Sequence, residues 1–545
     1  MKSYGVTKES ARPSRRDMIS GGGLAATGLL GSAVPALAAR PSSPDVYTRV
    51  GVQPFINLTA AVTINGGLLT LPSVKKAMEE ASHFSVNMDE LMEGVGRRLA
   101  ELFQCEAAIV TSGAAGALTH ATSACLAGGD PERIQQLPDL TGLRTEVLLP
   151  QESRNVYDHA IRALGVKMIT VETRADFHKA LSHDTAMIAV LGNAESMGRI
   201  RLEEMVEAGR KYGAPVLVDA SPEWPQSPDP YLSRGADLVT YSGGKICAGP
   251  QCSGFLLGRK DLVKSAWING APHHSFGRMM KVGKEEIMGA LAAAEYVLTK
   301  RNQEQELEKW NGWLRQIDDK VKRVRGVQTK LMPPPGKNPH PTLEVNWDAD
   351  RIGYTAGELH GVLLAGEPRI QTHASGDGHA FQIRVGNCRP QEIDVVTNRL
   401  VEVFQSAPKA KRKHDSPPAA DVTGRWEAEV SFVRGSGRHT LYFQAQGNQL
   451  RGTHQGQRGR GELSGKISGN QVRFHSRLEY DAERSSYSFE GTLKGNEIAG
   501  SLDLGEYGKG RFKAWRHEYG RPGRLDPSKS GQTRQGRVEV GAVAD

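Results

Sequence analysis

The sequence predicts an α/β protein with a largely parallel, doubly wound sheet, followed by a smaller antiparallel β domain. Two observations support this prediction. From about Val46 to Gln405, short β-branched runs alternate with amphipathic helical patterns, which is typical of strands joined by crossover helices. Further along the chain the pattern changes to a period of two residues. Gly-Asn pairs separate the strand-like runs there, as in tight antiparallel hairpins.

The expected elements of the first part follow in order. Strands are expected at residues 107–110, 145–149, 167–171, 186–191, 215–218 and 236–242. Helices are expected at residues 115–127, 158–164, 175–181, 202–212 and 284–300. The last of these helices is expected to lead into a smaller α/β subdomain.

These patterns divide the chain into six segments. We predict a signal peptide at 1–38, a large domain at 46–300, a small α/β subdomain at 301–405, a linker at 406–421, a β-rich domain at 422–519 and a disordered tail at 520–545. The linker is rich in Pro, Ala, Lys and Ser and has no periodicity. The β-rich domain is expected to be an antiparallel meander or a small closed barrel.

Composition narrows the possible classes of protein. The chain has 545 residues, of which 38% are hydrophobic and 24% charged, a soluble globular balance. The net charge is +8, but much of the excess lies in the N-terminal segment and in the run 409–413. No aromatic interleaving or reader motif accompanies it, so we expect no nucleic-acid partner. The five cysteines are an odd number without metal-ligand spacing, and we interpret them as reduced structural thiols. His273, His274 and His340 have no ligand-like partners, so no metal site is predicted.

The N-terminus has the pattern of an export signal. Arg15 and Arg16 precede a mild apolar stretch at 21–37, and Ala36-Leu37-Ala38 forms a small-residue cleavage site. The alternative is an uncleaved disordered tail. We expect twin-arginine export and a periplasmic or secreted protein. No other apolar run is long enough to span a bilayer, so no membrane association is expected after cleavage.

Two small motifs follow predicted strands. Ser112, Gly113 and Ala114 open a helix, and the free N–H groups of a helix N-terminus bind phosphate. Simple close packing is the alternative for such small residues. Asp219 ends the strand 215–218, where open α/β sheets place ligands. A buried carboxylate needs a cationic partner, such as a protonated pyridine nitrogen, although an Asp that caps the next turn is also common.

A lysine motif is the strongest signal. The strand at 236–242 ends at Ser242 and is followed by two glycines and Lys245. Lys245 is expected to face the same crevice as Asp219, and burial beside a cationic ring lowers the pKa of its amine, so that it can form an imine and later act as a base. Ser242 can add a hydrogen bond to a phosphate. An isolated lysine is usually a solvated surface charge, but here it follows two glycines at a strand end.

The segment from Ser242 to Gly254 resembles the cofactor-lysine motif of the selenocysteine synthase (L-seryl-tRNA selenium transferase)-like family, which includes the D-glucosaminate-6-phosphate ammonia lyases. The resemblance extends from about Tyr47 to Gln405, including residues 154–162 and 277–286. It departs in two places. A signal-like segment stands where the synthases carry a tRNA-binding extension, which argues against selenium transfer, and the β domain is not part of the family pattern.

The resemblance implies the three-layer fold of aspartate-aminotransferase-like, pyridoxal 5′-phosphate (PLP)-dependent transferases, with a small α/β subdomain. It implies that Lys245 carries PLP as a Schiff base, that Asp219 pairs with the ring nitrogen, and that Ser112, Gly113 and Ala114 hold the phosphate. It also implies a homodimer or a ring of dimers. The basic residues Arg278, Lys281 and Lys284 match a cluster at a subunit boundary beside the cofactor, where we expect substrate binding.

Three further residues are candidates around this site. Arg384 lies on a C-terminal strand where such enzymes often hold a substrate carboxylate, and Arg369 competes for that role. Either arginine can instead form a surface salt bridge. His159 can stack on the cofactor ring, although a histidine on a helix surface is the simpler interpretation.

The expected activity is that of a PLP-dependent lyase or transferase on a small amino acid or amino sugar acid. Removal of the α-proton would lead to β-elimination, as in an ammonia lyase, or to β-replacement. Aminotransfer or racemisation would use the same residues. A catalytically inactive protein that binds a partner through its β domain is the other hypothesis.

Overall fold

The structure is a computed structural model, and it describes residues 45–373, 378–409 and 415–518. The expected signal peptide and the whole of the expected C-terminal tail lie outside the described residues, as do residues 410–414 of the expected linker. Residues 45–54 belong to a separate N-terminal unit with one short helix, α1 (Asp45–Thr48). Everything from Phe55 onward belongs to the second unit.

A seven-stranded sheet forms the centre of the large domain, in the order β2-β8-β7-β6-β5-β3-β4. The strands are β2 (Ala107–Ser112), β3 (Glu146–Pro150), β4 (Lys167–Val171), β5 (Thr185–Leu191), β6 (Val216–Asp219), β7 (Leu238–Ser242) and β8 (Ser253–Gly258). The pairs formed among β3, β4, β5, β6 and β7 are all parallel, whereas β8 runs antiparallel to both of its neighbours. The largely parallel, doubly wound α/β fold is therefore confirmed.

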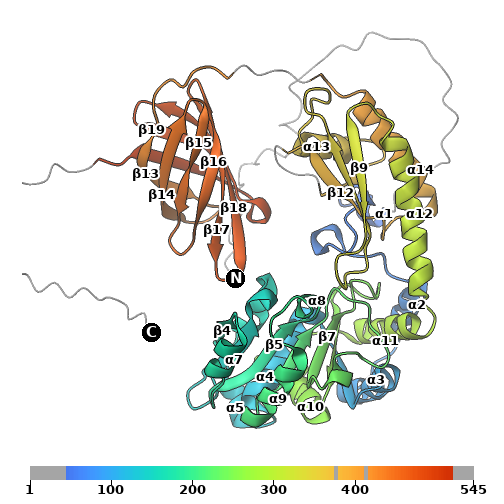
Figure 1. Cartoon of the computed structure of the whole chain (residues 1–545). Coiled ribbons are helices and arrows are strands. Elements are labelled where there is room, and N and C mark those ends of the chain that lie inside the picture. Colours follow the sequence, from blue (N-terminus) through green and yellow to red (C-terminus); the bar gives the residue numbers. More distant parts are fainter. Residues whose placement is uncertain (1–44, 374–377, 410–414, 519–545) are drawn as a thin grey trace, which may run out of the picture. The chain divides into compact units, whose positions relative to one another are not determined.

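Helices surround this sheet (Figure 1). They are α2 (Pro72–Ser82), α3 (Met88–Phe103), α4 (Gly113–Ala127), α5 (Pro131–Gln136), α6 (His159–Arg162), α7 (Arg174–Ala180), α8 (Gly192–Glu195), α9 (Leu202–Tyr212), α10 (Lys260–Ile268) and α11 (Lys284–Thr299). The central helix α4 is buried along most of its length, because its small residues let it lie against the sheet.

Among the elements that differ from the sequence expectation, two lie close to the predicted motifs. Strand β8 was not predicted, because its apolar core of three residues is short and glycines and a cysteine precede it. The helix expected at 158–164 is a 3₁₀ turn, η4 (Val156–Asp158), followed by the short α6. The Asn155 side chain accepts a hydrogen bond from the Tyr157 N–H at 2.8 Å, which starts the turn early.

The small subdomain places a three-stranded antiparallel sheet beside long helices (Figure 1). Its elements are α12 (Gln303–Val321), β9 (Val327–Met332), β10 (Thr342–Trp347), α13 (Ala356–Ala365), β12 (Ala380–Ile383) and α14 (Pro390–Gln405). A two-residue parallel pair, β1 (Ile56–Asn57) with β11 (Ile370–Gln371), joins the start of the second unit to this region.

The C-terminal part is a closed barrel of eight antiparallel strands, drawn in orange and red in Figure 1. The strands are β13 (Gly424–Ser431), β14 (Ser436–Gln446), β15 (Gln449–Gln455), β16 (Arg460–Ser468), β17 (Gln471–Tyr480), β18 (Glu483–Lys494), β19 (Glu497–Asp503) and β20 (Lys509–Arg516). The barrel has its own apolar core, which includes Trp426, Phe443 and Phe489. Of the two forms expected, the structure shows the barrel. Closure pairs every strand on both sides, which removes exposed strand edges.

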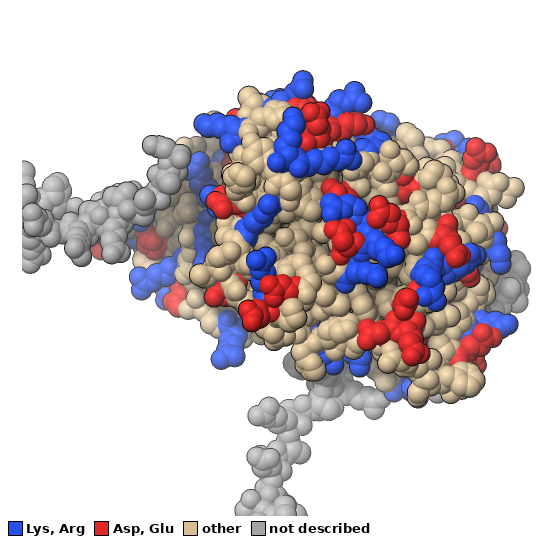
Figure 2. All heavy atoms as spheres, turned by 90° about the horizontal axis from the view of Figure 1, so that it is seen from below, with Lys and Arg blue, Asp and Glu red and all other residues tan. Residues whose placement is uncertain are grey.

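Basic and acidic side chains are interspersed on the face that Figure 2 shows, so the positive net charge is not concentrated there. In the described parts of the chain, no helix combines the length and the apolar character needed to cross a bilayer. The cysteines are all free; Cys247 and Cys388 are buried, whereas Cys252 is exposed.

Candidate active site

The three motifs from the sequence meet at one edge of the large sheet. Asp219 ends β6 and Ser242 ends β7, and these two strands are parallel neighbours. Ser112 ends β2, and the start of β8 lies between it and Ser242, since Ser253 pairs with Ser112 and Gly254 pairs with Ser242. Neighbouring strands are about 4.8 Å apart, so the three strand ends fall within a span of about 15 Å. This is the edge at which open α/β sheets bind ligands.

The turn that carries Lys245 is closely fitted to its neighbours. A Cβ atom on Gly243 would lie 2.1 Å from Ser253 Oγ, and one on Gly244 would lie 2.6 Å from Gln251 Cα. Larger residues at either position would therefore collide with the chain that leads into β8. The turn is closed by hydrogen bonds from Ala248 N to Lys245 O and from Gly249 N to Gly243 O, each 2.9 Å long. The two glycines thus serve to place Lys245 against the sheet edge.

Lys245 lies in a setting that favours a neutral amine. Burial lowers the pKa of Lys245, and the negative charge of Asp219 opposes this effect. Its ammonium forms no hydrogen bond or salt bridge with the described residues; its Nζ atom lies 5.3 Å from the centre of the Tyr157 ring. A lysine with few polar partners is more easily deprotonated, which both imine formation and proton transfer require.

Asp219 is 8% exposed and offers one oxygen to a ligand. Its Oδ1 atom accepts hydrogen bonds from the Ser221 N–H, at 3.0 Å, and from the Ser221 hydroxyl. Its Oδ2 atom has no hydrogen-bond partner among the described residues. A small cavity beside it is lined by Asp219, Leu118, Asn155 and Tyr157, together with apolar residues of β3 and β5. The free oxygen can accept a hydrogen bond from the protonated nitrogen of a cationic ring.

The start of α4 fits a phosphate group. Ser112 is the N-cap residue, and its hydroxyl caps no backbone N–H of the helix. Gly113 has a φ of 71°, in the left-handed region that glycine adopts without strain. A Cβ atom on Gly254 would lie 2.6 Å from Ala114 N, so this glycine lets β8 approach the first turn. The first N–H groups of the helix are thus left for an anion, as at other helix N-termini that bind phosphate.

Tyr157 is a site residue that the sequence reasoning missed. It precedes His159 in the segment 154–162, and it is Tyr157 that lies over the ammonium of Lys245. His159 is exposed. An aromatic residue within a matched motif was the available signal, but the short 3₁₀ turn that directs its ring could not be seen in the sequence.

Glu223 is a second residue that was missed. It is 3% exposed, accepts hydrogen bonds from the Tyr231 hydroxyl at 2.8 and 2.9 Å, and lies 3.9 Å from Lys337 Nζ. Burial raises the pKa of Glu223 to about 7, and the hydrogen bond from Tyr231 opposes this effect. It follows Asp219 by four residues, and the charge of Asp219 acts on it. The nearby sheet edge therefore contains an acid that titrates close to neutral pH.

The predicted substrate-binding cations have different surroundings. Arg278 and Lys281 are exposed, whereas the Lys284 ammonium pairs with Glu285. Their segment lies near the expected phosphate loop, because a Cβ atom on Gly116 would come within 4.0 Å of Met280 Sδ. Their role at a subunit boundary stays a prediction.

Arg384 is well suited to bind a carboxylate. Its guanidinium donates hydrogen bonds to Thr342 Oγ1 and Gln382 Oε1, both at 3.2 Å, and it has no acidic partner among the described residues. Burial lowers the pKa of Arg384. The competing Arg369 donates instead to the Leu364 carbonyl at 2.9 Å. Of the two arginines, Arg384 has the greater need for an added anion.

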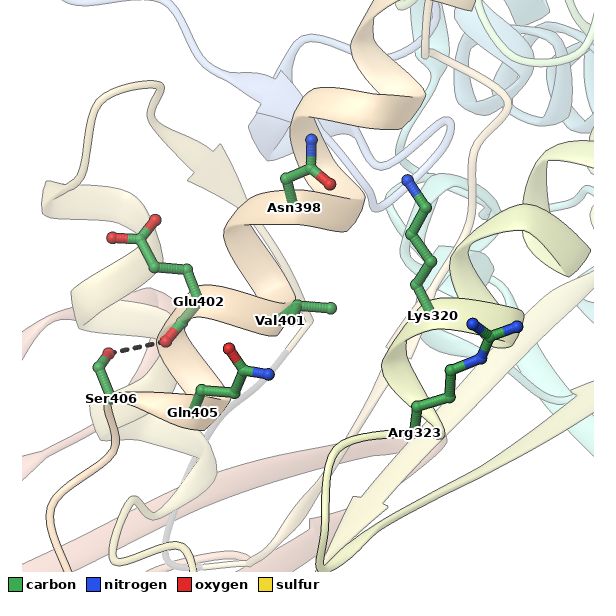
Figure 3. Close-up of a pocket in the computed structure, with 7 residues that line it drawn as sticks. All are labelled: Lys320, Arg323, Asn398, Val401, Glu402, Gln405 and Ser406. Atoms are coloured by element: carbon green, nitrogen blue, oxygen red, sulfur yellow. Dashed lines mark hydrogen bonds between the residues drawn. The ribbon is translucent and has the colours of Figure 1, made fainter. Parts of the chain in front are cut away.

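A larger open hollow lies in the small subdomain, between the C-terminal ends of α12 and α14 (Figure 3). Lys320 comes from α12 and Arg323 follows the end of this helix, whereas the other lining residues, including Asn398 and Glu402, come from α14 and the residue after it. No residue of the sheet-edge site lines this hollow, so it is separate from that site.

Comparisons with known proteins agree with the fold. Residues 72–289 match the family model of class-V aminotransferases. A 5′-C-glycyluridine monooxygenase-decarboxylase from Streptomyces is 31% identical, over 59% of this chain and 83% of the relative. The D-glucosaminate-6-phosphate ammonia lyase of Salmonella typhimurium is 26% identical, over 67% of this chain and 99% of the relative. A solved structure of a D-glucosaminate-6-phosphate ammonia-lyase, 24% identical, has the same fold with a TM-score of 0.57, over 67% of this chain and 99% of that one.

Proposed function

Because this chain belongs to the selenocysteine synthase-like and D-glucosaminate-6-phosphate ammonia lyase-like family of fold type I PLP enzymes, we propose that it eliminates or replaces a β-substituent of an amino acid or amino sugar acid. PLP is its cofactor, and it is a PLP-dependent enzyme that acts on small amino compounds. The observation that supports the proposal best is Lys245, a partly buried amine with few polar partners beside Asp219.

The residues at the sheet edge match the parts of PLP. The Ser112 hydroxyl and the N–H groups of Gly113 and Ala114 would hold its phosphate, to which Ser242 can add a hydrogen bond. The free Oδ2 atom of Asp219 would pair with the ring nitrogen and keep it protonated. Lys245 would hold the cofactor covalently. When bound, PLP supplies an electron sink for the negative charge that develops at the α-carbon of the substrate.

The protein side chains then have distinct tasks. Lys245 removes the α-proton as a neutral amine, the form that its burial favours. Arg384 holds the substrate carboxylate, which supplies the negative charge that the described partners of this arginine lack. Tyr157 lines the cavity beside Asp219, and the centre of its ring lies 5.3 Å from the Nζ atom of Lys245. Arg278, Lys281 and Lys284 would act at the boundary of a homodimer or a ring of dimers.

The test is a scan of purified protein, loaded with PLP, against amino acids and amino sugar acids. Elimination predicts release of ammonia together with an oxo acid. Lys245→Ala should abolish this release, whereas Lys211→Ala, at an exposed ion pair on α9, should not. Turnover by the Lys245→Ala protein at the rate of the native protein would refute the proposal. Transfer of the amino group to an added oxo acid would instead support aminotransfer, and loss of optical activity would support racemisation.

Oxidative decarboxylation is a second candidate, since the Streptomyces relative named for that reaction is more similar in sequence than the ammonia lyase. It predicts consumption of oxygen and release of carbon dioxide, neither of which elimination requires. Measuring both gases in the same scan separates the two reactions.

We also propose export by the twin-arginine route, on the strength of the sequence pattern around Arg15 and Arg16. The changes Arg15→Lys and Arg16→Lys together should retain the protein in the cytoplasm. Unchanged distribution between cell fractions would argue against this route.

A further inference from the structure

Arg301 is a buried cation outside the set of site residues described above. It lies between α11 and α12, and its side chain is 6% exposed. Its guanidinium has three contacts. Nη2 pairs with Glu306 at 2.6 Å, the ring of Trp224 lies 4.7 Å below Cζ, and Nη1 donates a hydrogen bond to the carbonyl oxygen of Ile246. The last of these is the carbonyl of the residue that follows Lys245.

Burial of the Arg301 cation costs free energy. A buried charge loses hydration and must be compensated by a counter-ion and hydrogen bonds. Glu306 supplies the counter-ion, but the Nε atom of Arg301 is buried and has no hydrogen-bond partner in the described structure. A lysine could neutralise Glu306 with less exacting geometry. The planar guanidinium is needed to pair with Glu306, stack on Trp224 and reach the Ile246 carbonyl at the same time.

The turn at Lys245 needs support from outside. Ala248, which closes it, has a φ of 49°, in the left-handed region that non-glycine residues rarely adopt. One support is the start of α2, where the Leu71 N–H donates to the Ala248 carbonyl at 3.0 Å. The other is Arg301, which holds the Ile246 carbonyl in the middle of the same turn. The two supports act on successive parts of a strained backbone.

Arg301 is also in contact with the region after Asp219. Trp224, on which the guanidinium lies, follows Asp219 by five residues and stacks on Trp310 of α12 with a centroid distance of 6.2 Å. The same side chain therefore contacts the loop after β6 and the turn after β7. The first of these segments follows Asp219 directly, and the second carries Lys245.

We propose that Arg301 is a positioning residue for Lys245, which holds the Ile246 carbonyl and so fixes the turn from which the lysine projects. The proposal rests on the proposed function only in that Lys245 is taken to hold PLP. Glu306 and Trp224 hold the guanidinium in turn. Arg301 itself contacts neither Lys245 nor Asp219 by any hydrogen bond or ion pair of the described structure.

The test compares Arg301→Gln, Arg301→Lys and Glu306→Gln with Arg315→Gln, a control at an exposed ion pair on α12. For each full-length protein, the dissociation constant of PLP and the pH midpoint of the visible absorption of the bound cofactor are measured. Arg301→Gln should raise the dissociation constant of PLP about tenfold and shift the pH midpoint of absorption. The reason is that the turn becomes more mobile and no longer holds the Lys245 amine in one orientation. Arg301→Lys should recover part of the loss, and Arg315→Gln should change neither quantity.

Hydrogen exchange in the cofactor-free protein gives a second readout. The Ala248 and Gly249 amides, which close the turn, should exchange about tenfold faster in Arg301→Gln than in the native protein. A lower melting temperature with unchanged PLP affinity, pH midpoint and exchange would overturn the proposal, because it would show a merely structural role. If Arg301→Gln does not fold, the same measurements on Arg301→Lys and Glu306→Gln distinguish a positioning role from a merely structural one. If Lys245→Ala keeps the native spectrum, the proposed function fails, and the exchange data still decide on Arg301.

Discussion

This protein has one cluster of polar residues at the sheet edge and another inside the barrel. The polar groups of the barrel cluster bond to one another, whereas several of those at the sheet edge have no partner among the described residues. In the barrel, a hydrogen bond of 2.7 Å joins His439 to His454, and another of 2.7 Å joins His454 to Ser476. Burial lowers the pKa of both histidines, which favours the uncharged form of each ring. At the sheet edge, by contrast, Lys245, one oxygen of Asp219 and the first N–H groups of α4 lack such partners.

The difference shows how to separate a site from a structural network. Buried polar groups normally find partners within the protein, as those of the barrel do. Groups that remain unpaired at the edge of a parallel sheet, where ligands bind, are candidates for contact with something that the chain itself does not supply.

The largest effect is expected from Lys245→Ala. Turnover should fall by at least about 10⁴-fold, because the variant loses both the covalent attachment and the base. The melting temperature of the cofactor-free protein should hardly change or should rise, since the buried amine has no hydrogen bond to lose. Steady-state kinetics and thermal unfolding test both parts. A large loss of stability would mean that Lys245 is a structural residue, like those of the barrel network.

Asp219→Asn should reduce turnover about 10³-fold, or about 4 kcal/mol, because it leaves the cofactor nitrogen without its negative partner. The change keeps the shape of the side chain and the contact with Ser221. Kinetics at saturating PLP isolate this effect from cofactor loss. Native turnover in this variant would show that the free oxygen of Asp219 has no part in the reaction.

The raised pKa of Glu223 predicts that the stability of the folded protein depends on pH. The pKa of Glu223 is raised to about 7 in the folded protein, whereas an unfolded glutamate has an ordinary pKa of about 4.5, so the folded state retains a proton that the unfolded state releases between these values. Stability should therefore fall as the pH rises from about 4.5 to about 7, by at most about 3 kcal/mol. Glu223→Gln should flatten this part of the profile. Unfolding measured at several pH values tests it, and an equally steep profile in the variant would assign the effect to other groups.

The smallest effect is expected in the barrel. Ser476→Ala leaves the Nδ1 atom of His454 without its partner and should destabilise the barrel by about 1–2 kcal/mol. PLP affinity and turnover should not change. Denaturant unfolding and kinetics on the same preparation measure both. Altered kinetics would show that the barrel network takes part in the function and would remove the contrast between the two regions.

The sequence predicted the fold class because strand and helix periods are local signals. It missed β8, since only three apolar residues stand between a glycine-rich stretch and the next glycine. The positions of Asp219 and Lys245 at one edge of the sheet could be predicted, because each follows from a residue type at or just after the end of a strand. The site was missed where function depends on tertiary approach: Tyr157 is directed by a short 3₁₀ turn, and Glu223 and Arg301 act through partners up to 114 residues away. The domain limits and the roles of Arg278 and Lys281 stay predictions.

The pairing of β13 with β20 has an evolutionary consequence. Trp426 on the first strand of the barrel is the partner of Arg516 on the last, so the module begins and ends at one place. A domain whose termini are adjacent can be inserted into a loop of another protein, or fused to its end, without distorting the fold of that protein. The same geometry makes the barrel a natural candidate for circular permutation, in which new ends are cut at a hairpin such as 446–449 and the old ones are joined by a short linker.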